Sequence, residues 1–92
     1  MNWTVIILCM FAKDLAGLPP KVKEAVEEFA FRILPATENP FALARIEKLQ
    51  GYRDFYRARF GRYRVGLRIV HKTRTIEIRC VKHRRDIYRH FP

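Results

Sequence analysis

The second half of the chain alternates between apolar and polar residues with a period of two, which is typical of strands with one buried face. Three segments show this alternation: residues 52–60, 63–71 and 75–82. A Gly-Arg pair at 61–62 signals a tight hairpin turn, and residues 72–74 form the second turn. The pattern therefore predicts an antiparallel meander of three strands.

The two faces of this meander differ in chemistry. One face of the second and third strands collects Tyr63, Val65, Leu67, Ile69, Ile76, Ile78 and Cys80. The opposite face of the meander collects Arg53, Arg57, Arg59, Arg64, Arg68 and Arg79. We therefore expect the rest of the chain to cover the apolar face and to leave the arginine face open.

The first half of the chain predicts one strand and two helices. Residues 4–10 form a continuous apolar run, which favours a strand covered on both faces and central in a sheet. Residues 11–18 have helical spacing, and the next helix begins at the proline pair 19–20 and ends at Pro35. The apolar stripe of this second helix is Val22, Ala25, Val26, Phe29 and Ile33.

The remaining segments connect or close the fold. Residues 36–50 lack a clear period and contain the turn signal Asn39-Pro40, so they are expected to be irregular with at most a helical turn. In the tail, Ile87 and Phe91 are spaced to point inward. The expected fold is α+β, a single domain over residues 1–92. In it, an N-terminal strand and a helical hairpin pack on one face of an antiparallel β-sheet of about four strands.

The charge of the chain lies almost entirely in its second half. Residues 52–92 hold thirteen Lys or Arg against three Asp or Glu, a net charge of +10, while residues 1–51 hold six of each. Because 49% of the residues are hydrophobic, the chain is globular rather than disordered. A strongly cationic sheet face is suited to a polyanion such as a phosphate backbone, although a basic surface with no such partner is the alternative.

Composition also argues against several other classes of protein. Cys9 and Cys80 each lie in an apolar run and read as buried free thiols, as expected in a reducing cytoplasm. The histidines and cysteines are too few at useful spacing for a zinc site, so we expect no metal and no cofactor. The apolar stretch 3–12 is too short to span a bilayer and is a poor signal peptide, so we expect no membrane partner and a cytoplasmic location.

The arginine face predicts a site for phosphate. Guanidinium groups bind phosphate in a bidentate manner and keep their charge, and a cluster of them repels itself unless an anion lies between them. We expect Arg57, Arg59 and Arg64 to gather there, with Arg84 or Arg85 and Tyr88 arriving from the tail. The surrounding residues expected to bind RNA are Arg53, Arg68, Arg79, His83 and Arg85.

Cleavage of RNA without a metal needs a base for the ribose 2′-OH, cations for the pentacoordinate phosphorane and an acid for the 5′ oxygen. The candidate bases are Tyr88, His83 and His90, and each of them is also a common type of surface or stacking residue. Free tyrosine loses its proton only near pH 10, while nearby arginines favour the phenolate. The residues alone leave the choice of base open.

Two stretches carry a resemblance to a known family: LQGYRDFYRARFGRYRVGLRI at residues 49–69 and CVKHRRDIYRHF at residues 80–91. Over essentially the whole chain, the sequence resembles the RelE family of toxins within the RelE/ParE superfamily, including the Leu-Pro pair at 18–19 before the second helix. The resemblance implies the toxin of a type II toxin–antitoxin system. Such a toxin is a metal-independent mRNA endonuclease that enters the ribosomal A site and leaves 2′,3′-cyclic phosphate and 5′-OH ends, and a RelB-like antitoxin holds it inactive.

The resemblance also implies roles for individual residues. Arg57 and Arg59 stand where the family places two basic residues, and Arg64 matches the arginine that binds the scissile phosphate. Arg84 matches a later arginine of the cluster, and Tyr88 matches the terminal tyrosine that acts as base or stacking platform.

Three features of this sequence leave alternatives open. The spacing between Arg84 and Tyr88 is short, so Arg85 can fill the arginine role, and histidines in some relatives keep His83 open as a substitute base. Arginine at both second-strand positions replaces a potential proton donor with a group that stays charged. The same scaffold also serves ParE-like toxins, which inhibit DNA gyrase and cut nothing, so the fold by itself does not separate the two functions.

Overall fold

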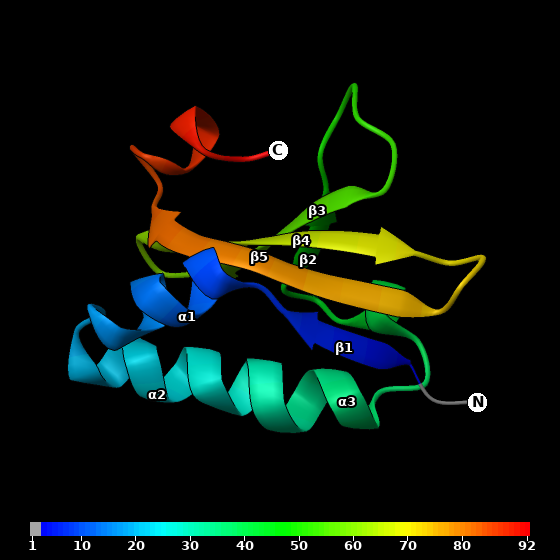
Figure 1. Ribbon diagram of the computed structural model, residues 1–92, viewed down its shortest axis with the longest axis horizontal. Coiled ribbons are helices and arrows are strands. Elements are labelled where there is room, and N and C mark those ends of the chain that lie inside the picture. The colour runs from blue at the N-terminus through cyan, green and yellow to red at the C-terminus, as the bar shows by residue number, and fades with distance from the viewer. Residues whose placement is uncertain (1–2) are drawn as a thin grey trace.

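Residues 3–92, which the computed structural model describes, form a five-stranded sheet with helices packed on one face (Figure 1). The first half of the chain contains β1 (Thr4–Ile7), α1 (Cys9–Ala16), α2 (Pro20–Glu28), the π-helical turn η1 (Phe29–Ile33), α3 (Leu34–Ala36), the 3-10 turn η2 (Pro40–Ala42) and β2 (Ile46–Lys48). The second half contains β3 (Phe55–Phe60), β4 (Tyr63–Val70), β5 (Thr75–His83) and the 3-10 turn η3 (Ile87–Arg89). The expected α+β class and the helical hairpin are confirmed.

The predicted meander is present as β3, β4 and β5, which pair antiparallel in sequence order. Gly61 has φ 60°, a conformation that the tight turn between β3 and β4 requires and that glycine adopts without strain. The turn sets Arg59 opposite Arg64 and Arg57 opposite Gly66. The hairpin therefore decides which basic side chains become neighbours.

The position of β1 differs from the prediction. The strand order is β1-β5-β4-β3-β2, so β1 is an edge strand, parallel to β5, and not a central strand. Ile6 and Ile7 are 40% and 37% exposed, so β1 is not covered on both faces. An apolar run indicates that a segment tends to be buried, but it contains no information about the order of the strands. In this fold β1 lies at the edge of the sheet, and the helices follow it in the chain.

The strand β2, which was not predicted, lies within residues 36–50, the segment that was expected to be irregular. It pairs antiparallel with β3 and places Glu47 directly opposite Arg57. Three residues are too few to display a period of two, which is why the alternation could not reveal this strand. The sheet is consequently mixed and has five strands rather than about four.

The second helix is longer than predicted and changes face midway. It continues as η1 and α3 past Pro35, which lies in the first turn of α3. The predicted stripe holds at Val26 and Phe29 but fails at Ala25, which is exposed, and at Ile33, which is 39% exposed. The wider π turn shifts the buried face by one residue, so Leu34 is buried instead.

A β-bulge changes the face of the last residues of β5. The register shifts at Gly66/Leu67, and Arg79 has no partner on β4. Ile76, Ile78 and Val81 therefore belong to the core under the helices, whereas Cys80 packs on the opposite face, contrary to the predicted alternation.

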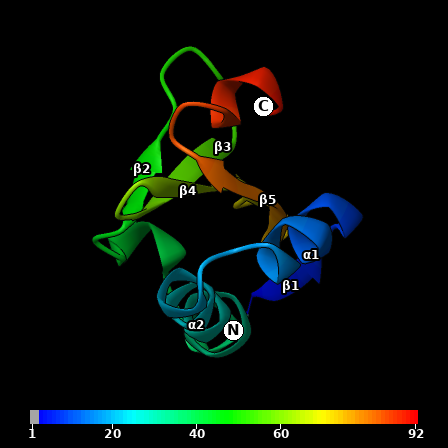
Figure 2. The same cartoon turned by 90° about the vertical axis from the view of Figure 1, so that its left-hand side faces the viewer.

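The C-terminal tail packs on the face of the sheet that the helices leave free (Figure 2). Ile87 and Phe91 are 1% and 2% exposed, which confirms that they point inward. They form a second, small core with Leu49, Cys80 and Phe55. The expected open face is thus only partly open, and the tail divides it.

Candidate functional site

Three arginines share the helix-free face at the end of the sheet formed by the β3–β4 hairpin. Arg57 and Arg59 are two residues apart on β3, so their side chains share one face of the sheet, and Arg64 lies on β4 opposite Arg59. Arg64 Nη1 donates to the carbonyl oxygens of Gly61 at 2.6 Å and Tyr63 at 2.9 Å. The turn itself therefore fixes the direction of this guanidinium.

Like charges surround Arg64. Burial and then the positive charges of Arg59, Arg57 and Arg84 hold the pKa of Arg64 below the ordinary value of a guanidinium, and Tyr88 opposes them. The other four residues that the sequence predicted as catalytic therefore all lie close enough to Arg64 to influence its charge. An anion placed among them would relieve this repulsion.

Arg57 connects the sheet to the tail. Its Nη1 donates a hydrogen bond to the Tyr88 hydroxyl, and its Nε donates to Glu47 Oε1 at 3.2 Å. Burial lowers the pKa of Arg57, but the hydrogen bonds with Glu47 and Tyr88 outweigh it and the pKa is raised. Glu47 Oε1 also lies 3.6 Å from Arg59 Nε, so one carboxylate serves two arginines.

The tail enters the site at Arg84, whose backbone N–H donates to the Arg62 carbonyl oxygen at 2.8 Å. This bond ties the start of the tail to the β3–β4 hairpin. Arg84 is also one of the cations that lower the pKa of Arg64.

Other predicted RNA-binding residues lie outside the cluster. Arg68 Nη1 and Arg79 Nη1 both bind Glu77, at 3.3 and 2.7 Å. Arg68 on β4 lies opposite Phe55 on β3, two residues along β3 from Arg57. The Phe55 ring packs against Phe91 of the tail. These two arginines consequently face a different part of the surface.

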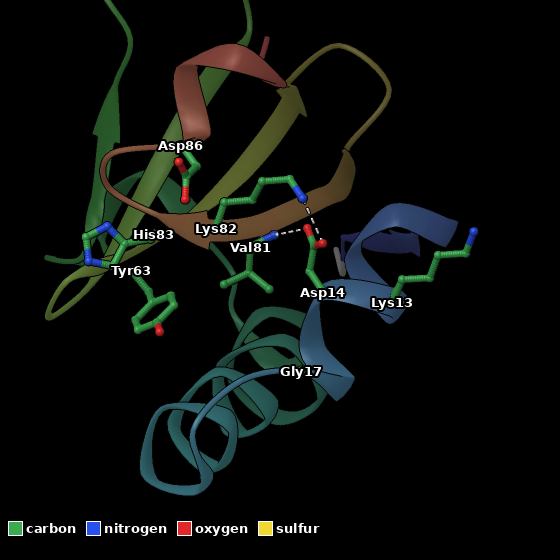
Figure 3. Close-up of a pocket in the computed structure, with 8 residues that line it drawn as sticks. All are labelled: Lys13, Asp14, Gly17, Tyr63, Val81, Lys82, His83 and Asp86. Atoms are coloured by element: carbon green, nitrogen blue, oxygen red, sulfur yellow. Dashed lines mark hydrogen bonds and ion pairs between the residues drawn. The ribbon is translucent and has the colours of Figure 1, made fainter.

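The remaining candidates are dispersed. The His83 ring meets the Tyr63 ring edge-on, with ring centroids 5.5 Å apart (Figure 3). The Nδ1 of His83 accepts a hydrogen bond from the Arg85 N–H. Arg53 is exposed in the loop before β3. His90 lines a separate small cavity with Met10 and Cys80. Of the three candidate bases, only Tyr88 lies in the cluster.

A cavity of about 320 Å³ opens beside the Arg57–Tyr88 contact. The loop between β2 and β3 supplies Gln50 and Tyr52 to its wall. The tail supplies Tyr88 and Arg89. The cavity therefore shares two residues, Arg57 and Tyr88, with the arginine cluster.

Two features of the site were not found in the sequence. Glu47 was overlooked because β2 is too short to be recognised from the sequence pattern. Asp14 was also overlooked: it accepts hydrogen bonds from Lys82 Nζ at 2.8 Å and from the Val81 N–H at 3.2 Å, at the edge of a cavity of about 410 Å³ (Figure 3). This contact fastens α1 to the strand that leads into the tail.

The arrangement is suited to binding a phosphodiester and moving a proton. Arg64, Arg59 and Arg84 supply positive charge, and the phenol of Tyr88 adds a group that can exchange a proton. Within residues 3–92, no three His, Cys, Asp or Glu side chains come together as metal ligands. Among the same residues, no helix has the length and apolar character needed to cross a bilayer.

Comparison with known proteins links the whole chain to bacterial and archaeal toxins. A family model described as the ParE toxin of the type II toxin-antitoxin system, parDE, matches residues 5–88. Toxin RelE3 of Methanocaldococcus jannaschii is 33% identical over 92 residues, which cover 96% of this chain and 98% of that protein. Toxin RelG of Mycobacterium tuberculosis is 37% identical over 89 residues, which cover 97% and 99%.

Solved structures give the same result. The RelB-RelE antitoxin-toxin complex of Methanococcus jannaschii contains a chain with a TM-score of 0.74 and 30% identity, covering 95% of this chain and 99% of that one. The RelBE2 toxin-antitoxin complex of Mycobacterium tuberculosis contains one with a TM-score of 0.69 and 32% identity, covering 90% and 99%.

Proposed function

This chain belongs to the RelE/ParE family of type II toxin–antitoxin toxins, and from that premise we propose that it is a ribosome-dependent mRNA endonuclease. It would cut a codon in the ribosomal A site and leave 2′,3′-cyclic phosphate and 5′-OH ends. The observation that carries the proposal is the meeting of Arg57, Arg59, Arg64 and Arg84 with Tyr88 on one exposed face.

The geometry supports a role for each member of the cluster. Arg64, held by its own turn, binds the scissile phosphate together with Arg59 and Arg84. After its hydroxyl proton has passed to water, the Tyr88 oxygen takes the proton of the 2′-OH, and the 2′ oxygen attacks phosphorus. The hydrogen bond from Arg57 stabilises negative charge on the Tyr88 oxygen.

The arginines also stabilise the phosphorane that forms, because their charge is fixed in place before the reaction. The bond from phosphorus to the 5′ oxygen then breaks. Guanidinium groups hold their protons too tightly to act as acids at neutral pH. The proton that the 5′ oxygen gains therefore comes from water.

The proposal implies three partners. The solved relatives named above are complexes of RelE with RelB, so we propose a RelB-like antitoxin that covers the cationic face. The substrate is mRNA, and the ribosome is the partner that presents it, which implies action in the cytoplasm. The gyrase-inhibiting alternative is not favoured, because the matched relatives carry the names RelE3 and RelG.

The test is primer extension on programmed ribosomes mixed with purified protein. Tyr88→Phe should lower the cleavage rate by a factor of about 100 or more, the range of general base catalysis. Arg32→Ala, a charge loss on the exposed helical side, is the matched control and should cut normally. Full cleavage by the double variant Tyr88→Phe, Arg64→Ala would refute the assignment.

A further inference from the structure

The cavity beside the arginine cluster has the properties of a binding site rather than of a surface irregularity. Its volume of about 320 Å³ is at the lower end of the range for ligand pockets, which suits a single flat ring system. Two of its walls are tyrosines that remain more than half exposed, Tyr52 at 52% and Tyr88 at 54%. Large aromatic surfaces exposed around a pocket are a common way to stack a nucleobase.

The Tyr52 wall is held in position by the core. Lys48 Nζ donates to the Tyr52 carbonyl oxygen and, at 3.3 Å, to that of Leu49. The Tyr52 ring meets Phe55 edge-on with centroids 6.5 Å apart, and Phe55 in turn packs on Phe91 at 5.5 Å. The loop that supplies Tyr52 and Gln50 is therefore anchored at both of its ends, by Lys48 of β2 and by Phe55 of β3.

Gln50 supplies the polar edge of the cavity. It is exposed, and its amide offers one acceptor oxygen and a donor nitrogen side by side. This pair matches the Hoogsteen edge of adenine, where the N6 donor lies beside the N7 acceptor, whereas the corresponding edge of cytosine offers only its N4 donor. Among the residues that line this cavity, only Arg57 and Arg89 have charged side chains.

We propose that this cavity is a nucleobase subsite, in which the base beside the scissile phosphate stacks on Tyr52 while Gln50 selects adenine. Arg57 and Tyr88 belong to both the cavity and the cluster, so a base in the cavity is attached to the phosphate that the cluster holds. The inference rests on the proposed endonuclease function and extends it to the choice of codon.

The cleavage test compares ribosomes programmed with A-site codons that differ at one position by A or C. Wild-type protein should prefer A at one codon position, and Gln50→Glu, which can only accept, should shift that preference toward C by about tenfold. Tyr52→Ala should lower kcat/KM for all codons by about tenfold, and Tyr52→Phe, which keeps the ring, should recover most of that loss. An unchanged base preference in Gln50→Glu and Gln50→Ala would overturn the subsite.

A binding test separates failure of the subsite from failure of the nuclease. Adenosine 3′-monophosphate is titrated into the full-length wild-type protein, and the NMR shifts of the Gln50 side-chain amide are followed. Shifts at Gln50 that exceed those from cytidine 3′-monophosphate support the subsite even if no message is cut. Equal or absent shifts at Gln50 refute it, whether or not the protein cleaves RNA.

Discussion

Gly66 is the position where a single methyl group should disconnect the tail from the sheet. A Cβ built there would lie 2.8 Å from Cδ1 and Cγ of Phe91 and 3.0 Å from Cys80 Sγ. Phe91 is 2% exposed and cannot turn away without leaving its small core. Because atoms essentially never approach this closely, Gly66→Ala must push Phe91, and the tail with it, off the sheet.

The cost follows from packing. Adding a methyl group to a filled core costs about 1–3 kcal/mol, and complete loss of a buried phenylalanine costs about 3–5 kcal/mol. We expect Gly66→Ala to lose about 1–3 kcal/mol of unfolding free energy, which lowers Tm by about 4–8 °C per kcal/mol in a domain of this size. Tyr88 precedes Phe91 in the same tail and contacts Arg57, so RNA cleavage should fall even at temperatures where the variant is folded.

The assay is thermal unfolding by circular dichroism, with cleavage measured at 25 °C. Gly17→Ala is the matched control, because its Cβ would meet nothing closer than Asp14 O at 3.7 Å, and it should be neutral or slightly stabilising. Replacing the ring in Gly66→Ala, Phe91→Leu should recover part of the lost Tm. Wild-type Tm and cleavage in Gly66→Ala would refute the packing argument.

Three further predictions concern charged and titratable groups. Glu47→Gln should lower stability by about 1 kcal/mol or less, since its ion pairs are half exposed, and should tighten single-stranded RNA binding in a filter assay because an anion leaves the site. Asp14→Asn should cost about 1–3 kcal/mol in urea unfolding, because it leaves Lys82 without its partner in a largely buried contact. Burial raises the pKa of the Cys80 thiol to about 11, so at pH 8 it stays protonated and iodoacetamide should label only the exposed Cys9; mass spectrometry that finds Cys80 modified in folded protein would contradict this.

The parts of the fold that could be predicted are those in which one periodic signal runs for many residues. β4 alternates over eight residues with no interruption in its side-chain pattern, and its buried Val65, Leu67 and Ile69 were identified correctly. The convergence of Arg57 and Arg59 with Arg64 follows from the same period and from the tight turn that sets the register. Position along two paired strands is enough to make neighbours of these side chains.

Two of the errors in predicting buried residues depend on insertions of one residue. The π turn exchanges Ile33 for Leu34 on the buried face, and the bulge at Arg79 exchanges Cys80 for Val81. Neither event changes the residue types in a recognisable way, because each residue that is exchanged is as apolar as its replacement. Packing between the sheet and the helices decides which of the two neighbouring residues joins the core between them, and the sequence alone does not contain this information.

Glu47, which the sequence pattern did not reveal, shows how one overlooked residue changes the description of the site. Without it, all the clustered arginines are equivalent cations; with it, Arg57 and Arg59 already have a carboxylate partner. Among residues 3–92, Arg64 has no acidic partner and is bound only to carbonyl oxygens of its own turn. An incoming phosphate therefore gains more from Arg64, which has no carboxylate partner among the described residues, than from Arg57 and Arg59, where it must compete with Glu47. A phosphate of the message is thus expected to bind first at the β3–β4 turn, and to reach Arg57 and Tyr88 only when it displaces a carboxylate.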